Sequence, residues 1–127
     1  MADVSQQMTY GGQHTENVAA GTGAANVVVY APAALPSGAQ GSNPSGGRLC
    51  RITVLTAATA ILVLYDNAST DSGNILFVVP SNAPVGAIYD VQMPFDNGIV
   101  ALQASGSPQV AISYNVDATG GRGVGGR

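Results

Sequence analysis

His14 and the serines are the first side chains to consider for catalysis, because a serine hydroxyl needs a base such as histidine to become a nucleophile. His14 is the only histidine, and it lies in the glycine-rich stretch GGQHTENVAAGTG. There is no second histidine, and the single cysteine lies far from His14 in the sequence, so no spacing typical of a metal site is present. No serine stands in a G-x-S-x-G motif. We therefore expect a solvated His14, with no catalytic triad, no metal and no cofactor.

Acidic and amide side chains cluster in the stretch 66–74, DNASTDSGN. Calcium is bound by oxygen ligands from such loops, but the spacing does not follow the D-x-[DN]-x-[DN]-G pattern. Asn and Asp also hydrogen-bond their own backbone in turns, and we favour this interpretation over a calcium site. The side chains in question are Asp66, Asn67, Asp71 and Asn74.

A carboxylate pair for general acid-base catalysis is not apparent. Asp90 stands in the middle of a predicted strand and Asp96 in a predicted turn. The single cysteine, Cys50, falls on a predicted inward-facing strand position, so we expect a small core residue without a disulfide. We expect no enzymatic activity from this chain.

The composition is poor in charge. Charged residues make up 9% of the 127 residues, there is no lysine, and the net charge is −3. Soluble monomers normally carry about 25% charged residues, so we expect much of this surface to meet other protein. The acidic balance argues against nucleic acid as the main partner. The N-terminal stretch MADVSQQMTYGGQHTE has no basic region and no apolar run, which predicts no signal peptide.

Short strands with period-two alternation dominate the middle of the chain. The stretch 49–67, LCRITVLTAATAILVLYDN, predicts a β-hairpin. It contains fewer apolar residues than the roughly 20 that a membrane-spanning helix needs. Val63 and Tyr114 are predicted to face inward. Counting NVVVYA, seven strands predict an antiparallel β-sandwich of jelly-roll or immunoglobulin-like type. The predicted strands cover 26–31, 49–54, 61–65, 75–79, 88–93, 99–104 and 109–115.

Glycine divides the chain into three parts. Of its 17 glycines, eight lie in residues 1–48 and five in 117–127, and the four between them, at 73, 86, 98 and 106, all stand where a turn is needed. We therefore predict a low-complexity arm over 1–48 with one strand at 26–31, a sandwich core over 49–116, and a Gly/Arg tail over 117–127. Low-complexity segments bury too little apolar area to order by themselves.

The arm and the tail carry the predicted assembly contacts. The strand NVVVY can add to a sheet edge, in this chain or in a neighbour. In the tail ATGGRGVGGR, the two arginines could contact phosphate or stack on a base, but two arginines are few and the core is acidic. We favour docking on an acidic protein groove over phosphate contact, and a solvated tail over both. The residues concerned are Val27, Val28, Val29, Tyr30, Arg122 and Arg127.

Several motifs together resemble a class of small virion proteins of tailed bacteriophages. They are Y-D-N-x-S at 65–69, S-G-x-x-L at 72–76, P-F-x-N-G-I at 94–99, S-G-x-P at 105–108 and V-x-I-S-Y at 110–114. The resemblance covers about 49–116 and implies a small β-sandwich of the virion without enzyme activity. The absence of an intrachain disulfide suits a protein made in the host cytoplasm. Such proteins decorate or cement the head, or belong to the neck, tail or fibres. Other virion proteins would be the partners, and a homo-oligomer is expected. The alternative is a carbohydrate-binding or adhesin module.

Overall fold

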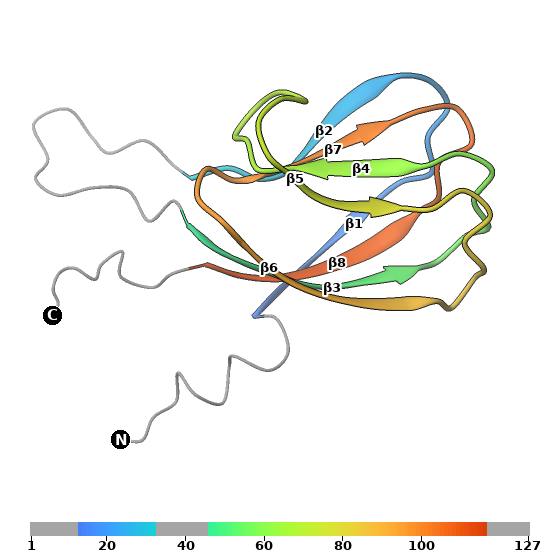
Figure 1. Cartoon of the computed structure of the whole chain (residues 1–127). Helices are drawn as coiled ribbons and strands as arrows, with labels where there is room; N and C mark the ends of the chain where they lie inside the picture. The colour runs from blue at the N-terminus through green and yellow to red at the C-terminus, as the bar shows by residue number, and fades with distance from the viewer. Residues whose placement is uncertain (1–12, 33–45, 117–127) are drawn as a thin grey trace, which may run out of the picture.

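The computed structural model describes residues 13–32 and 46–116, and all the elements in this part are β-strands. They form two antiparallel four-stranded sheets packed as a sandwich, with strand orders β1-β8-β3-β6 and β2-β7-β4-β5 (Figure 1). The strands are β1 (His14–Val18), β2 (Ala25–Tyr30), β3 (Gly47–Val54), β4 (Leu62–Tyr65), β5 (Ile75–Val79), β6 (Ile88–Phe95), β7 (Ile99–Gln103) and β8 (Val110–Val116).

The pairing is nested: β1 with β8, β2 with β7, β3 with β6, and β4 with β5. This is one long antiparallel hairpin wound upon itself, the eight-stranded jelly roll. An immunoglobulin fold keeps its first two strands as neighbours in one sheet, whereas here β1 and β2 lie in different sheets. The sandwich prediction is confirmed, and the strand order selects the jelly roll.

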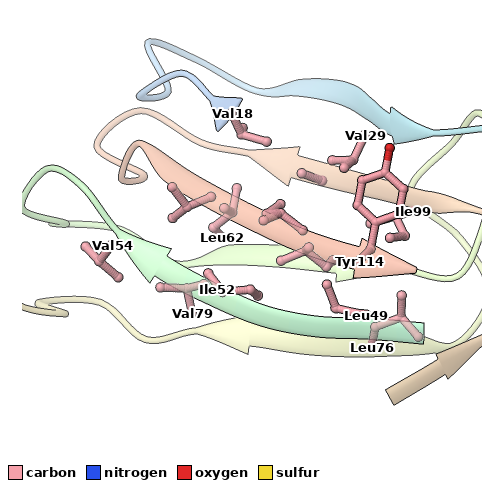
Figure 2. Packing of buried hydrophobic residues seen from close by; sticks show 14 of the residues in the cluster. Val18, Val29, Leu49, Ile52, Val54, Leu62, Leu76, Val79, Ile99 and Tyr114 are labelled. Carbon is pink, nitrogen blue, oxygen red and sulfur yellow. The ribbon is translucent and has the colours of Figure 1, made fainter. Parts of the chain in front are cut away.

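The core lies between the two sheets, where aliphatic side chains from both inner faces meet (Figure 2). Both sheets contribute fully buried residues to it, among them Leu49, Ile52, Leu62, Val79 and Ile112. Burying side chains of this size contributes about 1.5–3 kcal/mol each. Aliphatic packing between the sheets is therefore the main source of stability.

The predicted hairpin over 49–67 is wrong, although both of its strands exist. β3 pairs with β6 and β8, while β4 pairs with β5 and β7. The connection 55–61 therefore crosses from one sheet to the other instead of turning back along β3. Alternation identifies a strand from its own side chains, but it carries no information about which strand lies beside it.

The predicted arm over 1–48 also needs correction, because its described part contains two strands of the sandwich, the first of which starts at His14. β1 and β2 each supply one edge strand, and β1 was not predicted. Its sequence, HTENV, has only one buried residue, Val18. A polar edge strand of this kind lacks the apolar alternation by which strands are recognised. Residues 1–12, 33–45 and 117–127 lie outside the described residues.

Two predicted side-chain orientations differ from the structure. Leu62 and Leu64 belong to the core, so Val63 lies on the outer face of its sheet, where neighbouring side chains nevertheless bury it. Cys50 is fully buried but is not part of the core cluster. A register shift between Leu49 and Arg51 inserts one extra residue into β3. Such a bulge turns that residue away from the face that alternation assigns to it.

Candidate functional site

The loop 66–74 uses its side-chain oxygens in hydrogen bonds within the protein. The carboxylate of Asp66 is buried and accepts backbone N–H groups from the β6–β7 turn. Asn67 Oδ1 accepts the N–H groups of Ser69 at 2.9 Å and Thr70 at 3.0 Å. This is the local side-chain-to-backbone pattern of a turn. Within 13–32 and 46–116, no group of three or more His, Cys, Asp or Glu side chains could hold a metal ion.

Asp71 connects this loop to the opposite edge of the sheet. Its Oδ1 accepts a hydrogen bond from Asn26 Nδ2 of β2 at 3.2 Å. Since β4 and β2 are separated by β7 in the sheet order, the loop lies across the sheet rather than extending away from it (Figure 1). Val100 of β7, in the middle of the same sheet, is fully buried although it is not part of the core cluster.

His14 opens β1 and stacks on Tyr114 of β8, with ring centroids 5.2 Å apart. Tyr114 also packs on Tyr30 at 5.6 Å, and Tyr30 on Phe95 at 5.8 Å. Aromatic pairs at these distances contribute about 0.5–1.5 kcal/mol each beyond area burial. The histidine is thus tied to the fold by a ring contact, which the sequence did not indicate.

Cys50 is a poor nucleophile in this environment. Burial raises the pKa of the Cys50 thiol, and the opposing effects of Arg48 and Arg51 are smaller. The thiol donates to the Arg48 carbonyl oxygen, and Asn115 Nδ2 donates to the sulfur, both at 3.6 Å. A reactive cysteine needs a lowered pKa and access to solvent, so these contacts indicate a structural residue.

The predicted assembly contacts divide into three groups. Val29 is in the core, and Val27 and Tyr30 pack against it, because β2 is part of this chain's own sheet. Val29 is buried, whereas Val27 and Tyr30 are only partly buried. Val28 stays exposed on the outer face. Arg122 and Arg127 lie outside the described residues.

The connections β1–β2, β3–β4, β5–β6 and β7–β8 meet at one end of the sandwich (Figure 1). They comprise residues 19–24, 55–61, 80–87 and 104–109, and none of these residues is charged. We call this surface the uncharged end. Backbone hydrogen bonds join its loops: Gly21 to Ser107 at 3.0 Å, Thr59 to Gly106 at 2.9 Å and Asn82 to Ala58 at 3.0 Å.

Three large aliphatic side chains stand exposed in the loops of this end. They are Leu55, Ile61 and Val85, each between 38% and 62% exposed. The charged side chains Asp66, Asp71 and Asp96 lie instead in the β4–β5 and β6–β7 connections, at the opposite end. The sequence contains the signal for the uncharged end, in four charge-free loops, but only the winding of the strands brings those loops together.

The described part contains no helix that could span a membrane. No protein-family model matches the sequence, and comparisons with curated proteins and with solved structures find no significant match.

Proposed function

We propose that this chain is a non-enzymatic structural protein of a tailed-bacteriophage virion, which decorates or cements the capsid or attaches at the neck or tail. The observation that carries the proposal is the uncharged end, with Leu55, Ile61 and Val85 exposed on it. We assign docking on another virion protein to this surface. The motif resemblance over 49–116 supports the same class of protein.

Physical chemistry favours such a surface for docking. Burying a charge without a partner is costly, and this end has no charge to bury. Its loops are held by backbone hydrogen bonds to one another, so little conformational entropy is lost when they bind. Aliphatic side chains that are already exposed contribute about 25 cal/mol per Å² when they leave water.

The carbohydrate-binding alternative has less support. Sugar-binding sites present aromatic faces to solvent, but the rings here are engaged with one another. Tyr30 packs on Phe95, and Phe77 packs on Tyr89 with ring centroids 5.3 Å apart. Within the described residues, these contacts count against an open aromatic face at those four rings.

The test uses particles assembled from the genome that encodes this chain, with the gene intact or deleted. We expect the chain in gradient-purified intact particles, and we expect the purified full chain to co-sediment with the deleted ones. The double variant Leu55→Glu, Ile61→Glu should co-sediment far less, because it brings two charges into the interface. Thr15→Glu, on the exposed part of β1, is the matched control and should bind as the wild type does.

Absence of the chain from purified particles, together with no co-sedimentation, would show that it is not a virion protein. Equal binding of the double variant and the wild type would instead show that docking uses another surface.

A further inference from the structure

The two sheets have four edge strands, β1, β6, β2 and β5. An edge strand has unpaired backbone groups, and proteins protect such edges with charge, proline or a covering segment. β1 carries Glu16. β6 carries Asp90 and Pro94. β2 has its Asn26 side chain bonded to Asp71 of the loop that lies across its sheet.

Within the described residues, β5 has none of these protections. Its sequence is ILFVV, without charge or proline, and it pairs only with β4. Of the eight large hydrophobic side chains exposed in the described residues, five lie in the continuous segment 75–93 that contains β5. They are Ile75, Val78, Val85, Ile88 and Met93.

Apolar side chains also close the side of the sandwich at which β5 and β6 meet. Phe77 of β5 packs on Tyr89 of β6. The opposite side, at β1 and β2, has exposed Thr15, Glu16 and Asn17 instead. On the β5–β6 side, the exposed charge of Asp90 belongs to β6, and the β5 edge itself is uncharged.

We propose that β5 pairs antiparallel with β5 of a second copy of this chain, in an isologous two-fold dimer. The pairing would join the two β2-β7-β4-β5 sheets into one continuous sheet. A two-fold axis places the same strand opposite itself, so a charged edge would face its own charge. Pairing β1 with itself would bring two Glu16 side chains close, and pairing β6 would do the same for Asp90. The uncharged β5 has no such cost, and its exposed aliphatic side chains would meet across the strands.

This inference extends the expected homo-oligomer, but its test is independent of the virion proposal. Self-association is measured on the isolated full chain, without particles. A monomer that co-sediments with particles would overturn the dimer alone, and a dimer absent from particles would overturn the virion proposal alone.

The experiment measures the mass of the full chain by light scattering and by sedimentation over a range of concentrations. We expect a concentration-dependent rise from 12.7 kDa to twice that mass. Val78→Lys places a charge on the β5 edge and should weaken dimerisation by at least about tenfold. Val28→Lys is the matched control, because Val28 is an exposed valine on the other edge strand of the same sheet (47% exposed, against 39% for Val78). It should leave the dimer unchanged.

A wild-type monomer at every concentration would overturn the proposal, as would a trimer, a Val78→Lys dimer of full strength, or loss of the dimer in Val28→Lys. If Val78→Lys does not fold, amide hydrogen exchange of the wild type decides the question. Slower exchange over 75–79 in concentrated than in dilute protein supports the pairing, and equal exchange overturns it.

Discussion

Asp66 and Asn97 join two turns that lie 31 positions apart in the chain. The backbone N–H of Asn97 donates to Asp66 Oδ1 at 2.7 Å, and the N–H of Asp96 donates to both carboxylate oxygens at 3.0 Å. Asp66 directly follows β4, and its buried carboxylate therefore accepts hydrogen bonds from two N–H groups of the β6–β7 turn. Hydrogen bonds to charged groups contribute about 1.5–3 kcal/mol, so this link should stabilise that end of the jelly roll.

Asp66→Asn should lower the free energy of unfolding by about 1–3 kcal/mol, because one of the accepting oxygens becomes an NH₂ donor facing N–H groups. Asp71→Asn is the matched control in the same loop. Its side chain is exposed, makes the bond to Asn26 and should change stability by about 0.5 kcal/mol or less. Urea unfolding of both variants checks the prediction. Equal effects would show that burial of Asp66 does not matter.

Tyr114→Ala should destabilise the protein by about 3–5 kcal/mol, the usual cost of truncating a buried aromatic residue. Tyr114 is in the core cluster and contacts the rings of His14 and Tyr30. His14→Ala removes one exposed ring contact and should cost about 0.5–1.5 kcal/mol. Thermal unfolding followed by circular dichroism compares the two. A His14→Ala variant as unstable as Tyr114→Ala would mean that β1 depends on the histidine.

The thiol of Cys50 should make stability depend on alkaline pH. Burial raises the pKa of this thiol in the folded protein, so the folded chain keeps its proton where the unfolded chain loses it, above about pH 8.5. Deprotonation then favours the unfolded state. The contribution is complete below that pH and is lost as pH rises toward the folded-state pKa. Urea unfolding at pH 7 and pH 9.5 should show a smaller loss in Cys50→Ala than in the wild type. An identical loss would contradict the effect.

Gly98 and Gly86 both have positive φ angles, +147° and +90°, so alanine at either position would strain the backbone. They differ in the room that the surrounding atoms leave for a Cβ. A Cβ on Gly86 would meet nothing within 4 Å, whereas one on Gly98 would lie 2.6 Å from the Tyr30 carbonyl oxygen and 2.7 Å from that of Asn67. Gly86→Ala should therefore cost only the backbone strain, about 1–2 kcal/mol. Gly98→Ala should cost more, because backbone atoms must also move. Chemical denaturation of both variants gives the difference, and equal costs would contradict the crowding at Gly98.

Deleting residues 1–30 should prevent folding, because it removes β1 and β2, one edge strand from each sheet. Val18 and Val29 are buried and would no longer cover the core. Circular dichroism of the truncated chain should show a loss of the cooperative unfolding transition. A cooperatively folded truncation would mean that the other six strands form a complete core without them.

The amino-acid sequence by itself determined the features that depend on neighbouring residues. Alternation in Val110, Ile112 and Tyr114 correctly identified the inner face of β8. The glycines at 73, 86, 98 and 106 marked turns that do have positive φ. The low content of charged residues predicts a surface suited to contact with other protein.

Only the tertiary structure decided which strands pair and which faces are covered. β3 and β4 follow each other in the chain but lie in different sheets, and β1 finds its place through pairing with β8, about 100 residues away. The bulge at Cys50 and the outward position of Val63 depend on the register with those distant partners. Local pattern cannot encode these relations, because pairing and register are set by contacts between strands far apart in the chain. The same long-range winding brings four charge-free loops together at one end.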